Sequence, residues 1–376
     1  MRRDKIEHFG KKLTINKMLW LLTGPVFYAL FRLSFLWPDV TETVYSKGIF
    51  RILSQGLSTV TGFLPVSLSE LLLYAFVLSI IVYIFIMIIH TITAKNSRWH
   101  VFLNRLISLL CVFSIIYAVF IGLWGFNYSR QTLSQTLRLD TSFASVRELT
   151  DTCQALIERA KGFRDIIPED SKGIFSPNFS RQYVMQNTSE YYNKSAAATG
   201  YVFLGGSFGQ AKPVLYSTGL SYAEISGIYF PFTGEANVNI DMPMLYFPTA
   251  CLHEAAHQRG FAREDEANFL AFFVSMYVDD ASVSYSGIML ALTHAMNNLY
   301  KEDRESYYRL RETYSAGMER DLQNNYKYWQ QYDGPVSEAS QTVNNTYLKV
   351  NMQQDGVKSY GRMVDLLIAL WRNGSI

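Results

Sequence analysis

The chain has 376 residues, of which 49% are hydrophobic and only 18% are charged, and its formal net charge is +2. This balance argues against a nucleic-acid-binding protein, which usually carries a concentrated basic excess, and the 15% of aromatic residues excludes a disordered chain. The three cysteines contain no CxxC pair, so neither a disulfide framework nor a cysteine zinc site is expected.

Three apolar segments in the first third of the chain predict membrane-spanning helices. Residues 71–93 and 106–129 contain no Lys, Arg, Asp or Glu, and each is at least as long as the ~20 residues that cross a hydrocarbon core. An earlier segment is weaker because Pro25 and Arg32 interrupt it. A signal peptide is the alternative there, but no small-residue cleavage site follows the apolar run. The predicted spans are residues 18–37, 68–93 and 105–126.

The basic residues beside these segments predict the orientation of the chain. Six lysines and arginines lie in the first 17 residues, and three more lie in or next to the loop between the second and third spans, whereas the first loop holds only Lys47 and Arg51. By the positive-inside rule, the N-terminus is cytoplasmic. We therefore expect a multi-pass protein of the plasma (inner) membrane, with the lipid bilayer as a partner and no nucleic acid. Its parts are a basic cytoplasmic tail (1–17), a three-span membrane domain (18–126) and an extracytoplasmic domain (127–376).

The outer part of the chain predicts an α+β domain. A capping box at residues 145–148 begins a helix, and residues 200–240 contain short β-prone runs broken by glycine and proline. From Pro248 the chain is mostly helical, with an apolar stripe over residues 307–329 that indicates core packing. Residues 363–371 are too short to cross a bilayer and predict a buried or interfacial helix. The expected fold is mainly α, with three N-terminal transmembrane helices before this domain.

The sequence His253-Glu254-Ala-Ala-His257 predicts a zinc site. Histidines at i and i+4 lie on one helical face about 6 Å apart, so both imidazoles can bind one zinc ion. The glutamate after the first histidine can take a proton from metal-activated water. Pro248 is typical of a first helical turn and Gly260 of a helix end, so the motif fills one short helix. Two histidines on an ordinary helix are the simpler alternative.

A third zinc ligand is expected in the next segment, where a second helix begins. Glu264, Asp265 and Glu266 fall in its first turn, where acids also interact favourably with the helix dipole. Asn268 shares a face with Glu264, and in this pattern the glutamate binds zinc while the polar residue holds a histidine by a hydrogen bond. Glu266 points about 200° around the helix from Glu264. We therefore expect Glu264, rather than Glu266, to complete a site for one Zn2+ per chain.

The motif HEAAHQRGF followed by EDEAN resembles the zincin metallopeptidases. Its Glu264-x-x-Ala-Asn268 element is similar to the ligand helix of the glutamate-zincins, including membrane CAAX-type proteases, which implies a zinc metallopeptidase with a peptide or protein substrate. The stretch HExxHxxGF is also similar to the metzincins. Arg263 stands where their third histidine would be and cannot replace that ligand.

Over nearly the whole chain, the sequence resembles an uncharacterised bacterial membrane-protein family known only as a domain of unknown function. This resemblance implies a metallopeptidase-like domain and gives no substrate. The shared elements are GFNYSR (125–130), YFPFTGEANVN (229–239), HEAAHQRGFAREDEANF (253–269) and GVKSYGRMVDLL (356–367).

A substrate-binding strand is the last candidate feature, because zincins pair an extended edge strand with the substrate backbone. Residues 227–239 are β-prone and end nine residues before Pro248. An ordinary hairpin with Gly234 in its turn is the equal alternative. The sequence assigns no role to Glu235 or His294.

Three functions are compatible with these features. The first is a membrane-anchored zinc metallopeptidase with Glu254 as the catalytic base at an extracytoplasmic site. The second is a catalytically inactive zincin-like scaffold or binding module, and the retained histidines and Glu254 argue against it, because a dead site usually loses its base. The third is an intramembrane protease, which the polar flanks QRGFAREDE exclude from the bilayer core. We therefore expect the first.

Overall fold

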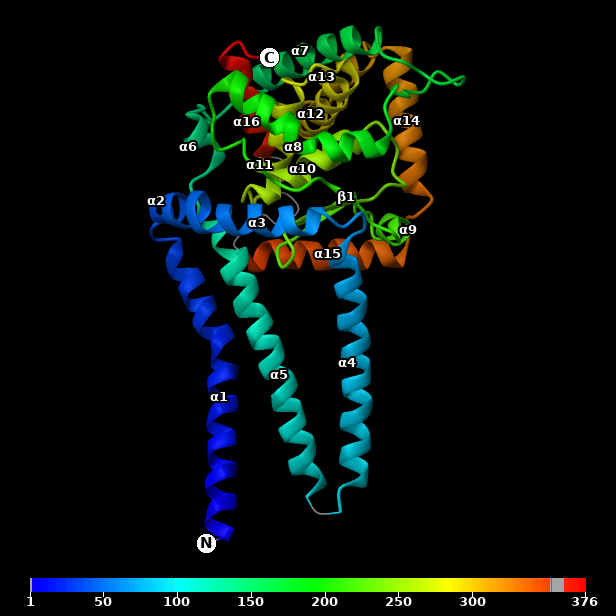
Figure 1. The fold of residues 1–376 in the computed structure, drawn as a ribbon. Helices are drawn as coiled ribbons and strands as arrows, with labels where there is room; N and C mark the ends of the chain where they lie inside the picture. The colour runs from blue at the N-terminus through cyan, green and yellow to red at the C-terminus, as the bar shows by residue number, and fades with distance from the viewer. Residues whose placement is uncertain (1, 96, 352, 354–361) are drawn as a thin grey trace.

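The computed structural model describes residues 2–95, 97–351, 353 and 362–376, and it is mainly helical, with 70% of residues in helices and 3% in strands. Three long helices extend from one side of a globular part, with the N-terminus at their far end and the C-terminus on the opposite side of the molecule (Figure 1). Met1 and residues 356–361, which belong to the last shared motif, lie outside the described residues.

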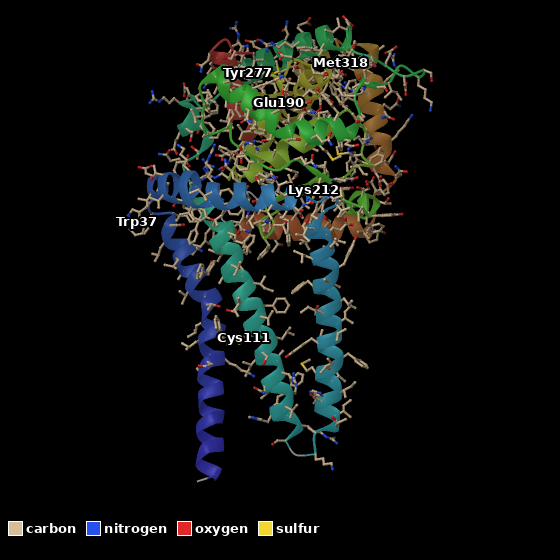
Figure 2. The ribbon with its side chains drawn as sticks, in the orientation of Figure 1. Trp37, Cys111, Glu190, Lys212, Tyr277 and Met318 are labelled. Carbon is tan, nitrogen blue, oxygen red and sulfur yellow. The ribbon has the colours of Figure 1, made fainter. Side chains whose placement is uncertain are left out.

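The long helices include two that are able to span a membrane by length and composition. These are α4 (Leu68–Thr93), which coincides with the second predicted span, and α5 (Arg98–Leu123), which overlaps the third but begins and ends earlier in the sequence than predicted. The first predicted span lies in α1 (Arg2–Ser34). By length and composition, its segment Asn16–Ser34 is able to span a membrane only together with Pro38–Gly62, and the two helices are bent by 106° relative to each other. Side chains along the middle of α4 and α5 are mostly carbon (Figure 2).

Helix α1 packs closely along α5, in keeping with a shared membrane environment. The backbone N–H of Gly24 donates to Ser114 Oγ over 2.8 Å, and a Cβ at Gly24 would lie 2.9 Å from the same oxygen. Small residues let helix backbones approach in this way within a bilayer, where apolar surface alone gives little driving force for association. At the other end of this contact, Lys17 Nζ donates to Asn104 Oδ1 over 2.6 Å.

A layer of helices lies across the ends of α4 and α5, between them and the globular part (Figure 1). It contains α2 (Pro38–Val40), the π-helix η1 (Thr41–Phe50), α3 (Arg51–Gly62) and, from far along the sequence, α15 (Pro335–Val350). A second hydrophobic core forms where this layer, the spans and the globular part meet. Its buried members are Phe31, Phe50, Ile121, Trp124, Tyr128, Tyr229 and Ala262.

The globular part is built around α10 (Phe247–Gln258), which packs against α8, α11, α12 and the sheet. Only one described residue of this helix, His253, is not buried, so α10 forms the centre of the main core. The other helices are η2 (Gly125–Ser129), α6 (Leu133–Leu137), α7 (Val146–Arg164), α8 (Arg181–Thr199), α9 (Ser217–Tyr222), α11 (Glu264–Ser275), α12 (Ala281–Glu302), α13 (Arg304–Arg311), α14 (Ala316–Gln330) and α16 (Met363–Arg372).

The sheet is small, with strand order β1-β3-β2. Strand β1 (Lys212–Pro213) pairs parallel to β3 (Glu235–Val238), which pairs antiparallel to β2 (Gly227–Phe230). Residues 227–239 therefore form a hairpin with Gly234 in its turn, and β2 is an edge strand of this sheet, so both interpretations of this segment stay open. The β-prone run at 200–208 forms no strand.

Several local predictions in the globular part are confirmed. Ser145 and Glu148 form the expected capping box at the start of α7, and α16 is a buried helix over the predicted segment. The apolar stripe at 307–329 is divided between α13 and α14, because Ser315 caps a new helix by accepting from the backbone N–H of Met318.

Candidate metal centre

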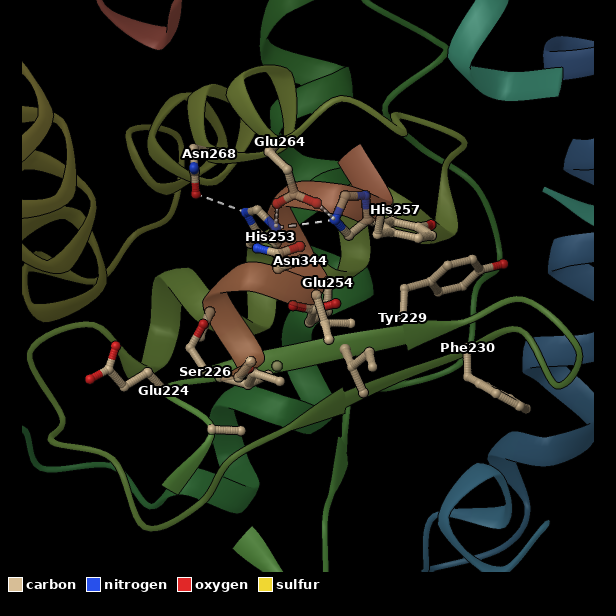
Figure 3. A pocket seen from close by; sticks show the side chains of 18 of the residues that line it. Glu224, Ser226, Tyr229, Phe230, His253, Glu254, His257, Glu264, Asn268 and Asn344 are labelled. Atoms are coloured by element: carbon tan, nitrogen blue, oxygen red, sulfur yellow. Dashed lines mark hydrogen bonds and ion pairs between the residues drawn. The ribbon is translucent and has the colours of Figure 1, made fainter. Parts of the chain in front are cut away.

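Helix α10 brings the two histidines of the motif together. Pro248 lies in its first turn, and Gly260 follows its end with φ +85°, a left-handed conformation that suits glycine. Over the intervening turn, His253 Nε2 and His257 Nε2 lie 3.1 Å apart. Both rings therefore direct one nitrogen toward the same point (Figure 3).

Helix α11 places a carboxylate at that point. Because the chain turns back at Gly260, Glu264 begins α11 directly beside α10, and its carboxylate oxygens lie 3.2 Å from His253 Nε2 and 3.7 Å from His257 Nε2. The three potential ligand atoms lie within 4.8 Å of one another. The residues predicted to bind zinc are thus gathered in one cluster, the metal centre of the following text.

The outer nitrogens of both imidazoles are held by oxygen atoms. His257 Nδ1 donates to the carbonyl of Phe261 over 2.6 Å, and His253 Nδ1 lies 2.8 Å from Asn268 Oδ1. A carbonyl oxygen only accepts, so each Nδ1 carries the proton and each Nε2 presents a lone pair to the centre. Two lone pairs and a carboxylate facing one another repel unless a cation lies between them. This donor set fits zinc, which binds imidazole nitrogen and carboxylate oxygen.

The pKa values of the two histidines also indicate that the cluster favours a bound positive charge. Burial disfavours the charged form of His253, but the hydrogen bond that its imidazolium donates to Glu264, together with the charge of that carboxylate, outweighs burial and raises the pKa of His253 to about 9. Burial lowers the pKa of His257 to about 4, although Glu264 opposes this effect and His253 adds to it. The cluster therefore accepts one positive charge between its three groups.

Glu254 lies on the same helix and lines the cavity beside the metal centre. Only 3% of it is exposed, and burial, together with the charge of Glu264, raises its pKa to about 8 against the opposing effect of His253. One carboxylate oxygen accepts from the backbone N–H of Tyr229 in β2, whereas Oε2 has no hydrogen-bond partner among the described residues. Glu254 thus has a free acceptor for a proton within the cavity.

Glu266, the alternative third ligand, lies away from the metal centre. Its Oε1 accepts from the backbone N–H of Leu133 over 2.7 Å and from Arg263 Nη1 over 3.0 Å. Only 2% of Glu266 is exposed. The helix-dipole interpretation of this residue is incomplete, because its main contacts tie α11 to the start of α6.

A family model described as "Protein of unknown function (DUF3810)" matches residues 45–368. The chain belongs to this family. The expected membership of an uncharacterised family is therefore confirmed, and the match covers α4, α5 and the whole metal centre of this DUF3810 protein. No curated protein and no solved structure matches the chain.

The metal centre of the DUF3810 chain opens into a cavity of about 840 Å³. The motif and β2 form one wall, as the sequence indicated, but two further walls were not predicted. One contains Trp124 and Tyr128 at the end of α5, and Trp124 contacts His257 with ring centroids 5.7 Å apart. The other is α15, which contributes Asn344 and Tyr347. No sequence signal links these distant segments to the zinc motif.

Glu235 has a role that the sequence did not reveal. It forms an ion pair with Lys212 over 2.6 Å, and each side chain is only 1% exposed. Its carboxylate also accepts from the backbone N–H groups of Leu68 and Ser69, at 3.1 and 2.7 Å. In the next position, Glu70 accepts from two backbone N–H groups that follow β1. These contacts fix the first turn of α4 to the sheet beside the cavity.

The other unassigned residue, His294 of α12, lies close enough to His253 for their charges to interact. Burial lowers the pKa of His294 to about 4, and the charge of His253 lowers it further. His294 is therefore neutral near pH 7, and it does not line the cavity.

Proposed function

We propose that this protein is a membrane-anchored zinc metallopeptidase that hydrolyses peptide bonds. The observation that carries the proposal is the convergence of His253, His257 and Glu264 on one point, with Glu254 buried beside it and a cavity in front. Three protein ligands with a free fourth position are typical of catalytic zinc, whereas structural zinc sites use four protein ligands. When bound, zinc supplies a Lewis acid that polarises the peptide carbonyl and makes water a stronger nucleophile at neutral pH.

In this function Glu254 moves the protons. Its unpaired Oε2 accepts a proton from the attacking water, and the resulting carboxylic acid donates that proton to the leaving amine. Burial raises the pKa of Glu254 to about 8, which favours the carboxylic acid that donates to the leaving amine, and the positive charge of a bound zinc would favour the carboxylate that acts as the base. Asn268 and the carbonyl of Phe261 keep the two imidazoles oriented.

Strand β2 is suited to hold an extended substrate. The backbone N–H of Asn239 donates to the carbonyl of Ser226, so the alternation of an antiparallel pair turns the backbone groups of Gly227 and Tyr229 away from β3. The N–H of Tyr229 reaches the Glu254 carboxylate, which agrees with this direction. The remaining backbone groups of this edge can pair with a peptide beside the metal centre, as in other strand-addition complexes.

The basic N-terminus supports an orientation with the metal centre outside the cytoplasm. Six Lys and Arg residues precede the first apolar segment, and positive charge is retained on the cytoplasmic side. We place the N-terminal tail in the cytoplasm and the metal centre on the outer face of the plasma (inner) membrane.

The proposal is tested by two variants of the full chain purified in detergent. Wild type should hold one zinc per chain by elemental analysis, and His253→Ala should hold less than one tenth of that amount. Glu254→Gln should retain zinc and lose hydrolysis of a peptide library by several orders of magnitude. Zinc without hydrolysis in wild type would instead identify an inactive zincin-like scaffold, and equal metal in wild type and His253→Ala would place the metal elsewhere.

A further inference from the structure

The cavity beside the metal centre adjoins the membrane-spanning part of the chain. One of its lining residues, Phe120, belongs to the candidate span α5, and Trp124 follows directly after that helix. Helix α15, which forms another wall, lies in the layer across the ends of α4 and α5, with α10 in the next layer (Figure 1). The metal centre therefore lies close to the level at which these helices would leave a bilayer.

Helix α15 presents an apolar face to the cavity. The apolar part of this wall is one side of the helix, where residues line the cavity at spacings of three or four: Val336, Ala339, Val343 and Tyr347. Uncharged polar residues of α15 line the cavity beside them: Ser340, Gln341 and Asn344. Val336 is 56% exposed and Val343 is 68% exposed, although both are apolar. Continuous exposed apolar surface on a helix is typical of binding grooves and of helices that lie at a membrane interface.

Strand β2 continues this apolar surface on the other side of the cavity. Ile228 is 46% exposed, and Phe230 and Phe232 also line the cavity. Among the described lining residues, the charged side chains outside the metal centre and its base are limited to Glu224. The surroundings therefore favour an uncharged, mainly apolar ligand and penalise buried charges that lack a partner.

We propose that the cavity takes the juxtamembrane segment of a polypeptide that is itself anchored in the bilayer. This inference rests on the proposed function and specifies its substrate class. The backbone groups of β2 that face away from β3, apart from the N–H of Tyr229 that Glu254 accepts, select a polypeptide over a lipid molecule, because an acyl chain offers no backbone groups to pair with them. The apolar faces of α15 and β2 then contact the apolar residues that border a membrane anchor.

The test measures binding alone, in the full chain carrying Glu254→Gln in phospholipid nanodiscs. p-Benzoylphenylalanine is introduced at Val343, on the cavity face of α15, or at Thr346, which does not line the cavity. The probe is a valine-rich heptapeptide joined to a synthetic leucine-alanine transmembrane helix by 5 or 25 Gly/Ser residues. The same heptapeptide without the helix is the reference, and crosslinked adducts are measured by mass spectrometry.

The 5-residue spacer reaches at most about 18 Å, so it serves only a site near the bilayer. The local concentration of a tethered group falls as about the −3/2 power of tether length, which predicts about 10-fold less crosslinking with the 25-residue spacer. With the photoreactive residue at position 343, we expect about 10-fold more adduct from the 5-residue spacer than from the 25-residue spacer. With the photoreactive residue in place of Thr346, we expect no adduct. Equal crosslinking of the free heptapeptide, or reaction of the long spacer alone, would overturn the inference, and lipid adducts alone would show a lipid ligand instead.

Crosslinking requires no hydrolysis, so this result is independent of the test of catalysis. Loss of the spacer dependence, with zinc and hydrolysis intact, contradicts only the substrate class. Spacer-dependent crosslinking of Glu254→Gln, together with a wild-type chain that binds zinc but hydrolyses no peptide, contradicts only the peptidase activity.

Discussion

Replacing Glu264 or Glu266 by alanine separates zinc binding from folding stability. The two residues lie in the same turn of α11 and have the same chemistry, but Glu264 faces two imidazole nitrogens at 3.2 and 3.7 Å while Glu266 accepts from a backbone N–H and Arg263. The Glu264→Ala variant should therefore lose zinc affinity, whereas the Glu266→Ala variant should lose folding stability. Asn268→Ala should resemble Glu264→Ala with a smaller effect, because Asn268 only orients His253.

The expected magnitudes follow from these contacts. Glu264→Ala removes one of three predicted ligands and should weaken zinc binding by at least about 10-fold, or ~1.4 kcal/mol. The metal-free protein should change little in stability, because without Glu264 burial favours the neutral form of His253 and no unpaired charge is left in the site. Glu266→Ala leaves the buried N–H of Leu133 without an acceptor, which costs about 1–3 kcal/mol of folding free energy.

Two measurements on each purified variant distinguish these outcomes. Zinc affinity is measured by titration of metal-free protein against a competing chelator, and stability by thermal unfolding of the metal-free protein in detergent. Glu264→Ala should change mainly the affinity, and Glu266→Ala mainly the unfolding temperature, by roughly 2–4 °C per kcal/mol. A Glu266→Ala variant that loses zinc, beside a Glu264→Ala variant that keeps it, would refute the assignment.

Three further predictions follow from the structure. Glu235→Gln leaves the ammonium of a buried lysine without its counter-charge and should lower the unfolding free energy by about 3–5 kcal/mol. The control is Arg147→Ala, which breaks an ion pair in which 90% of the Arg147 side chain is exposed and should change the unfolding free energy by less than about 1 kcal/mol. Equal effects of the two variants would contradict this reasoning. Gly227→Val places a Cβ 2.6 Å from Glu254 Oε1, so peptide hydrolysis should fall at least about 10-fold while zinc is retained. Gly162→Ala, with open space around its Cβ, should change neither hydrolysis nor zinc content. A loss of zinc in Gly227→Val would argue against a specific effect on the base. A phosphatase reporter fused after residue 130 should be active outside the cytoplasm, and activity of a cytoplasmic reporter at that position would reverse the proposed orientation.

The local arrangement of the metal centre could be predicted because it depends on short-range geometry. Helical spacing alone places His253 and His257 on one face, and a glycine after the helix end lets Glu264 begin the next helix nearby. The same spacing distinguished Glu264 from Glu266, since side chains two positions apart on a helix point in nearly opposite directions. The apolar runs in α4 and α5 were equally evident, because about 20 uncharged residues leave few alternatives.

The rest of the site depends on contacts between distant parts of the chain. Asn344 and Tyr347 join the cavity wall although more than 80 residues separate them from His257, and an amphipathic helix does not indicate which surface it will cover. The role of Glu235 was hidden for a related reason. Its partners are a lysine on another strand and the backbone of the candidate span α4, more than 160 residues earlier, and sequence spacing gives no information about such pairs.

The second hydrophobic core has a consequence for how the activity can be regulated. Trp124 and Tyr128, just after the candidate span α5, pack with Phe50 and Tyr229 in this core, and the rings of Trp124 and Tyr229 contact the ring of His257. A proteolytic cut after residue 130 would release the globular part without the side chains that enclose the metal centre on that side. In the proposed function, such a cut would therefore end hydrolysis rather than liberate a diffusible enzyme. The residues that enclose the metal centre come from both sides of this position, so the proposed chemistry would stay where the candidate spans hold it.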